Sequence, residues 1–123
     1  MKLTPNEVYT LASIVERETN QNAEKPRMAG VYYNRLKINM PLQADPTCVF
    51  ATRDFGAKRV LNYHKNFDSP YNTYLVRGLP PGPISMASIP SIDAVLNHET
   101  HKYLYFCAKP DDSGIHALSL IHI

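Results

Sequence analysis

The chain has 123 residues, of which 44% are hydrophobic and 20% charged, and these are the proportions of one globular domain with a real core. Its formal net charge of +2 is too small to indicate binding to nucleic acid and permits only a modest attraction to anionic polymers. No apolar run approaches the roughly eighteen residues of a membrane span and no leader-like segment begins the sequence, so we expect the chain as written to be soluble.

The first predicted helix begins near residue 5. Thr4 stands at a cap position, Pro5 at the first helical position and Glu7 three residues after Thr4, so hydroxyl and carboxylate can each satisfy a backbone N–H. One apolar face follows at helical spacing, formed by Val8, Leu11, Ala12 and Val15.

Two glutamates lie near the end of this helix. With about 100° of rotation per residue, Glu18 lies roughly 50 to 60° from the centre of the apolar face and Glu16 roughly 110° from it. We therefore expect Glu18 to be the more buried, Thr19 to face inward, and Ser13 and Arg17 to point to solvent. A carboxylic acid held where water is scarce suits acid/base catalysis at neutral pH, although most Glu-x-Glu pairs on helices are simply solvated.

Three further helical segments are predicted with decreasing strength. The second helix opens at Pro26, carries apolar residues such as Met28 and Tyr32 on one face, and must end before Pro41. Residues 91–97 form another, with Ser88 or Ser91 as its cap. A weakly patterned turn of helix is predicted around residues 57–66.

The clearest strand covers residues 103–108. The sequence at 111–114 has hairpin-turn chemistry and leads to a short return strand. Helices followed by a small antiparallel pair predict an α+β fold, with short helices packed on a small antiparallel sheet and long, ordered, Pro-rich loops.

Two of these loops have a composition suited to carbohydrate. Residues 40–47 and 68–83 combine prolines, which fix the backbone, with Asn, Gln, Thr and Tyr side chains. Rigidly held amides, hydroxyls and rings can pair with sugar hydroxyls and stack on sugar faces. The same residues would also suit a stiff loop whose polar groups bond only their own backbone, and both interpretations stay open.

Cysteine and histidine give no metal-binding pattern. Cys48 and Cys107 are compatible with one disulfide or with two buried thiols, and their apolar surroundings favour thiols. His64, His98 and His101 lack ligand spacing, so we expect solvated surface histidines. The sequence predicts neither a metal nor another cofactor.

Six blocks of sequence resemble, in order, those of the endolytic murein transglycosylases of the YceG-like (MltG) family: residues 11–19, 29–36, 40–47, 69–74, 78–84 and 103–106. The resemblance runs from about residue 11 to 116 and looks closest to versions from the Bacteroidetes group. It implies a lyase that cuts the MurNAc–GlcNAc bond within peptidoglycan strands and leaves a 1,6-anhydro-muramoyl end. Residues 1–117 would be the catalytic domain, truncated at both ends relative to the family.

The resemblance also implies roles for single residues. By position Glu18 is the catalytic glutamate, first general acid and then general base, and Glu16 makes a surface contact or one behind the site. The cleft that orients the glycan would contain Gln43, Asp45, Thr47, Tyr71, Asn72, Thr73 and His116. Asp45 is a rival second acid but is more typical of a turn or helix cap. His116 either polarises a substrate group or caps the hairpin.

Setting and partners follow only from the family. Its full members begin with a membrane-spanning helix and a small LysM-like region, which implies the periplasmic face of the inner membrane, peptidoglycan strands as partner, and cell-wall synthesis enzymes as further partners. A non-catalytic peptidoglycan-binding or scaffolding domain is the alternative, but such a domain needs no acid that is costly to desolvate. Residues 118–123 match a translated sequencing adapter, so we expect a non-native tail there.

Overall fold

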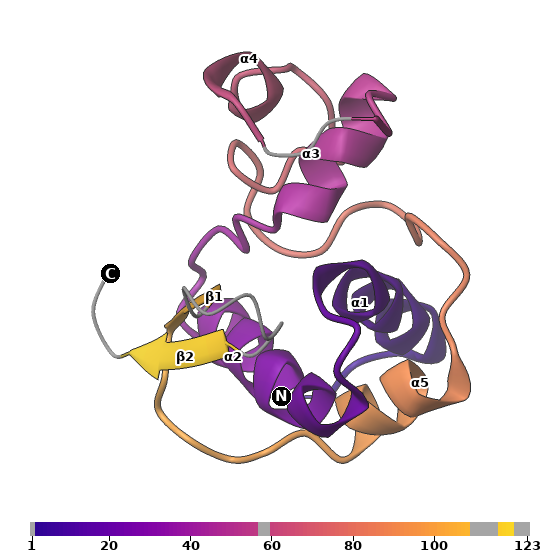
Figure 1. Ribbon diagram of the computed structural model, residues 1–123, viewed down its shortest axis with the longest axis vertical. Helices are drawn as coiled ribbons and strands as arrows, with labels where there is room; N and C mark the ends of the chain where they lie inside the picture. Colours follow the sequence, from indigo (N-terminus) through magenta and orange to yellow (C-terminus); the bar gives the residue numbers. More distant parts are fainter. Residues whose placement is uncertain (1, 57–59, 109–115, 120–123) are drawn as a thin grey trace.

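The computed structural model describes residues 2–56, 60–108 and 116–119, with backbone alone for 107–108 and 116–119. The predicted turn at 111–114, the side chain of His116 and residues 120–123 of the expected tail lie outside this description. Figure 1 shows the elements in order, which are α1 (Pro5–Glu18), η1 (Asn22–Glu24), α2 (Lys25–Lys37), α3 (Asp45–Thr52), α4 (Asn62–Lys65), α5 (Ile89–Leu96), β1 (Tyr105–Ala108) and β2 (His116–Ser119).

The predicted start of α1 is confirmed. The Thr4 N–H donates to the Glu7 carboxylate at 2.9 Å and the Glu7 N–H donates to the Thr4 hydroxyl at 3.2 Å, which is the expected reciprocal cap. Thr19 is buried and Arg17 exposed, as expected.

Ser13 was wrongly expected to point to solvent, because it is fully buried. The segment 84–88 covers this side of α1, with the Ile84 N–H donating to the Ser13 hydroxyl at 3.1 Å. That hydroxyl in turn donates to the Thr10 carbonyl of the same helix at 2.6 Å. Ile14 is also fully buried, although it lies outside the predicted apolar face. A helix enclosed on several sides buries a wider arc than one apolar stripe.

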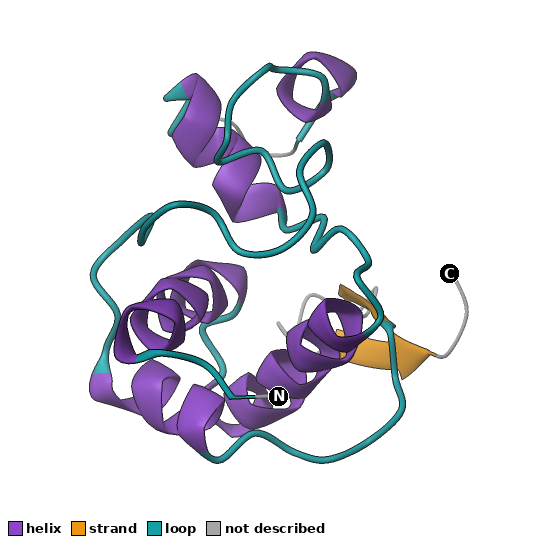
Figure 2. Ribbon diagram, turned by 180° about the vertical axis from the view of Figure 1, so that it is seen from behind, coloured by secondary structure: helices purple, strands orange, loops and turns teal. Residues whose placement is uncertain are grey.

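Three helices enclose the core. α1, α2 and α5 pack on one another, as the two opposite views show (Figure 2). α2 begins at Lys25, one residue before the predicted Pro26, and ends at Lys37, before Pro41 as predicted. α5 begins two residues earlier than predicted, at Ile89. The buried cluster consists of Leu11, Ala12, Ile14, Val15, Ala29, Tyr32, Tyr33, Leu42, Ala44 and Val95.

The smaller α3 and α4 lie at the far end of the molecule (Figure 1). The sequence predicts a rigid loop over residues 40–47, but α3 already begins at Asp45, with Pro46 in its first turn. Just before it, Gln43 adopts a left-handed conformation with φ of 51° and its N–H donates to the Thr73 carbonyl at 3.1 Å. This long-range bond fixes the bend of the chain just before α3. No local sequence pattern predicts this bond.

The chain is mostly helical, and the described strands form a single antiparallel pair with Tyr105 opposite Ser119 and Ala108 opposite His116. β1 begins two residues later than the predicted 103. The Asn34 side chain donates to the Tyr103 carbonyl at 2.8 Å, and the Arg35 side chain donates to the Leu104 carbonyl at 2.7 Å. The carbonyls of residues 103 and 104 therefore bond to α2 side chains. Within the described ranges, no helix is long and apolar enough to span a membrane.

Candidate active site

A cavity of about 590 Å³ lies where the end of α1 meets α3. Its wall combines two carboxylates and an arginine with apolar side chains, two of them aromatic. The lining residues are Arg17, Glu18, Asp45, Pro46, Val49, Phe50, Phe55, Val60, Ile84 and Ser85.

Glu18 is the last residue of α1 and reaches this cavity while keeping one contact with the core. The hydroxyl of the fully buried Tyr32, from α2, donates to Glu18 Oε2 at 3.3 Å. Tyr32 was predicted only as an apolar residue of its helix. Its hydroxyl bond to Glu18 joins α1 to α2 at the cavity.

The surroundings of Glu18 favour its neutral form. Burial raises the pKa of the Glu18 carboxyl to about 7, and the negative charge of Asp45 adds to this rise. The Tyr32 hydrogen bond and the positive charge of Arg35 act in the opposite direction. Because the resulting pKa lies near neutral pH, the group can both give and take a proton there.

Arg35 is a buried cation close to this carboxyl. Its guanidinium donates to the carbonyls of Leu104 and Leu42, and it lies over the ring of Tyr105 at 5.3 Å from the centroid. Burial lowers the pKa of Arg35. Sequence reasoning missed this residue, although it lies three positions after Tyr32 and so falls on the apolar face of α2.

Asp45 lines the cavity from the first turn of α3. The Tyr74 hydroxyl donates to its carboxylate, and burial together with this bond raises the pKa of Tyr74. Lys65 lies over the Tyr74 ring at 5.1 Å. The predicted cap position itself is held by Ala44, without a side-chain bond, so Asp45 is directed to the site and to Tyr74 instead.

Thr47, Asn72 and Thr73 are buried and bond to the protein itself. The Thr73 hydroxyl accepts the Ala44 N–H at 2.9 Å and lies 2.8 Å from the Thr47 hydroxyl. The Asn72 amide donates to three carbonyls, those of His64, Lys65 and Phe67, at 3.2, 2.9 and 2.8 Å. These contacts hold α3 and α4 in place and leave the three side chains no surface for a glycan.

Two other predicted residues lie at the margin. Tyr71 packs against Phe50 of the cavity wall, with ring centroids 4.9 Å apart. Gln43 is partly exposed but is not part of the cavity lining. The structure therefore brings Glu18 and Asp45 into one cavity, with Tyr71 beside it.

The expectation of solvated surface histidines is wrong for His64, whereas His98 and His101 are partly exposed and also contact the protein. His64 is buried, accepts the Leu61 N–H at 2.9 Å on Nδ1 and lies 3.0 Å from Asp54 through Nε2. His98 stacks on Tyr33 at 3.8 Å, and His101 lies 3.1 Å from the Arg27 carbonyl. Their partners come from loops and helices that only the fold brings near.

Cys48 is a free, buried thiol that donates to the Asn72 side-chain oxygen at 3.3 Å, and burial raises its pKa to about 11. The side chain of Cys107 lies outside the described part of the structure. Among the residues described, no three Cys, His, Asp or Glu side chains form a group able to hold a metal ion.

Comparison with known proteins gives consistent matches. A sequence model of the YceG-like family matches residues 1–120. The chain is 41% identical over 119 residues to the endolytic murein transglycosylase of Bacillus subtilis, covering 97% of this chain and 33% of that protein. It is 36% identical to the Streptococcus pneumoniae enzyme of the same name, covering 93% and 21%.

A solved structure agrees with the sequence matches. The crystal structure of a YceG-like protein from Listeria monocytogenes superposes with a TM-score of 0.85 at 40% identity, covering 91% of this chain and 36% of that one. The chain thus spans about a third or less of the length of the curated relatives.

Proposed function

Because the chain belongs to the YceG-like family, we propose that it is the catalytic part of an endolytic peptidoglycan lytic transglycosylase, a lyase that cleaves the MurNAc–GlcNAc bond within glycan strands. The observation that carries this proposal is Glu18, a carboxyl with a pKa near 7 at the edge of a cavity of about 590 Å³. A non-catalytic glycan-binding or scaffolding domain has no need of an acid held in this costly setting.

One carboxyl performs both proton transfers in the proposed mechanism. Protonated Glu18 donates to the departing glycosidic oxygen, and the glycosidic bond breaks. The carboxylate then takes the proton of the muramoyl C6 hydroxyl while that oxygen bonds to C1, which gives the 1,6-anhydro end and returns Glu18 to its acid form. No water is consumed, so the scheme differs from the two-carboxylate hydrolysis of ordinary glycosidases.

The neighbours of Glu18 support both halves of this cycle. Burial and the charge of Asp45 favour the proton-loaded acid before cleavage. The Tyr32 hydroxyl and the Arg35 cation favour the carboxylate once the proton has left. Asp45 is therefore proposed as a residue that sets the proton affinity of Glu18 and contacts substrate, and it is not required as a second acid.

The cavity offers two kinds of surface to a glycan. Phe50, Phe55 and the adjacent Tyr71 present rings for sugar faces, and Ser85 and Asp45 present polar atoms for hydroxyls. We propose that Thr47, Asn72 and Thr73 orient the glycan indirectly, by fixing the loops that carry these surfaces. Direct contacts of Gln43 and His116 with substrate stay predictions.

The setting of the whole protein is also a proposal. The family resemblance favours the periplasmic face of the inner membrane, with peptidoglycan strands as the substrate. Contact with cell-wall synthesis enzymes stays an expectation from the sequence.

Digestion of purified murein tests the function. We expect the unmodified protein to release fragments with new anhydro-muramoyl ends, detected by mass spectrometry, and Glu18→Gln to release none above background. Glu7→Gln is the matched control, since it removes a carboxylate of the same helix at the cap, away from the cavity. Binding of murein without new ends would exclude the enzyme, and equal yields from Glu18→Gln would exclude Glu18 as the acid.

A further inference from the structure

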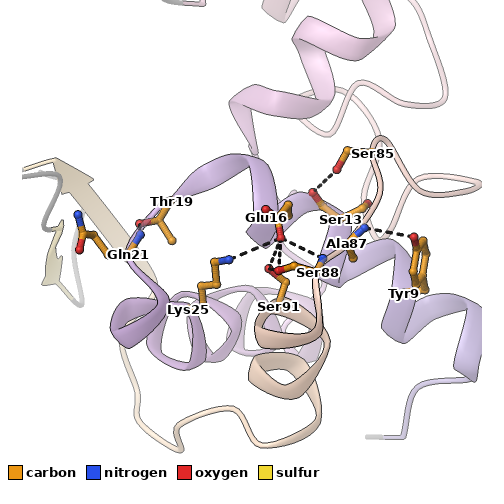
Figure 3. Close-up of polar contacts among 10 residues, drawn as sticks. All are labelled: Tyr9, Ser13, Glu16, Thr19, Gln21, Lys25, Ser85, Ala87, Ser88 and Ser91. Atoms are coloured by element: carbon orange, nitrogen blue, oxygen red, sulfur yellow. Dashed lines mark hydrogen bonds and ion pairs between the residues drawn. The ribbon is translucent and has the colours of Figure 1, made fainter.

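Side chains on one face of α1 bind the backbone of a distant segment of the chain, residues 84–88. Tyr9, Ser13 and Glu16 lie on successive turns of the helix, and each accepts a hydrogen bond from an N–H of the segment 84–88. Figure 3 shows the bonds of Tyr9 and Glu16 to Ala87 and Ser88. The donors Ile84, Ala87 and Ser88 reach Ser13, Tyr9 and Glu16 at 3.1, 3.2 and 3.0 Å respectively. Three hydrogen bonds from backbone N–H groups therefore fix this segment to the helix.

Glu16 makes the strongest attachment. Its Oε1 also accepts the Ser88 hydroxyl at 2.5 Å and the Ser91 hydroxyl at 2.8 Å, and lies 3.5 Å from the Lys25 ammonium (Figure 3). Ser88 is the cap residue of α5, so the carboxylate faces the positive end of that helix. These bonds lower the pKa of Glu16 to about 2, which keeps it charged at neutral pH.

The segment that these residues hold is also part of the cavity. Ile84 and Ser85 line it together with Glu18. Ser85 is attached a second time, because its hydroxyl donates to the Ser13 carbonyl at 3.1 Å. The acid and one wall of its cavity are thus fixed to the same helix.

We propose that Ser13 and Glu16 are positioning residues that hold the segment 84–88 as a wall of the Glu18 cavity and so keep water away from the Glu18 carboxyl. The inference rests on the proposed catalytic role of Glu18. Neither residue touches the reacting atoms, and each acts through the wall. When the wall loosens, water reaches Glu18 and its proton affinity falls.

The other charged and titratable groups near Glu18 come from elements that this change leaves in place. They are Tyr32 and Arg35 of α2, Asp45 of α3 and Tyr74 of the following loop. Arg17 of α1 lines the same cavity. Ser13→Ala alters no charge, so a fall in the Glu18 pKa in that variant would show that the segment 84–88 has loosened.

The test uses the protein without substrate, so its outcome is independent of murein digestion. Hydrogen exchange of single amides is measured by NMR, together with the titration of the Glu18 carboxyl. In Ser13→Ala and Glu16→Gln we expect the Ile84 and Ser88 amides to exchange about tenfold faster. We expect the Glu18 pKa to fall by about half a unit or more in Ser13→Ala.

Thr4→Ala is the control, because it removes an acceptor of a backbone N–H from the same helix without touching the segment 84–88. It should weaken the helix cap and leave both the exchange of the Ile84 and Ser88 amides and the Glu18 pKa unchanged. The proposal is overturned if Ser13→Ala leaves exchange and titration as in the unmodified protein, or speeds exchange without lowering the Glu18 pKa. Should Glu16→Gln fail to fold, Ser13→Ala alone decides.

Discussion

Glu16 and Glu18 lie two positions apart on α1, yet their surroundings move their pKa values in opposite directions, to about 2 and to about 7. Glu16 is surrounded by donors from Ser88, Ser91 and Lys25, which stabilise the charged form. The Glu18 carboxyl is shielded from water and lies near the negative charge of Asp45, and both effects stabilise its neutral form. One short peptide therefore provides a fixed anion and a titratable acid.

Asp45→Asn should shift the pH dependence of activity. The negative charge of Asp45 raises the pKa of Glu18, so removing it lowers that pKa, and the acid form is then lost at a lower pH. We expect the alkaline limb of the pH–activity profile to move down by about half a unit. The amide retains an oxygen able to accept the Tyr74 bond.

A carboxylate far from these contacts provides the comparison for this variant. Asp93→Asn, on an exposed position of α5, should leave the profile in place. An Asp45→Asn profile that coincides with that of the unmodified protein would contradict a role of Asp45 in setting the Glu18 pKa.

At the scale of elements, α4 depends on side chains from outside it, Asn72 above all and also Asp54, which contacts His64. This short helix has four residues, too few to be stable alone. Asn72 binds carbonyls at its end and just beyond, and its oxygen accepts the Tyr74 N–H at 3.0 Å. The position of α4, and through Tyr74 the surroundings of Asp45, follow from this residue.

Asn72→Ala should destabilise the protein by about 3 kcal/mol, because it removes several buried hydrogen bonds at once. Urea unfolding followed by circular dichroism measures the loss. Asn20→Ala, at an exposed position, is expected to change stability by less than about 0.5 kcal/mol. Equal stabilities of the two variants would show that Asn72 does not hold α4 in place.

At the scale of the molecule, the segment that leads to β1 packs directly on α2. A Cβ on Gly30 would lie 2.5 Å from the Glu99 carbonyl oxygen and 2.7 Å from His101 Nε2. The Glu99 N–H also donates to the Pro26 carbonyl at 3.0 Å. Only glycine permits an approach this close in the middle of the helix.

Gly30→Ala sets two effects against each other. Alanine favours the helix by about 1 kcal/mol, but displacing a backbone carbonyl costs about 1 to 3 kcal/mol or more. We expect the clash to prevail and the free energy of unfolding to fall by about 1 to 2 kcal/mol in denaturant titrations.

Gly56→Ala is the control for this variant, since a Cβ there meets nothing within 4 Å. A Gly30→Ala protein as stable as the unmodified one would mean that the segment at Glu99 moves away at little cost.

The features that the sequence alone determined are local ones. The start of α1 follows from Thr4 and Glu7, the start of α2 from Pro26, and the prominence of Glu18 from helical rotation and from the resemblance. Caps, prolines and periodicity act over a few residues, so they can be read without knowing the fold.

Only the tertiary structure decided which polar groups are buried and with whom. Ser13 and His64 were expected on the surface, α3 was expected to be a loop, and Arg35 was overlooked, because each has partners from elsewhere in the chain. The same applies to the two glutamates. Their spacing is written in the sequence, but the surroundings that charge one and neutralise the other come from α2, α3 and α5. Proton affinity depends on burial and neighbouring charge, which exist only once the chain has folded.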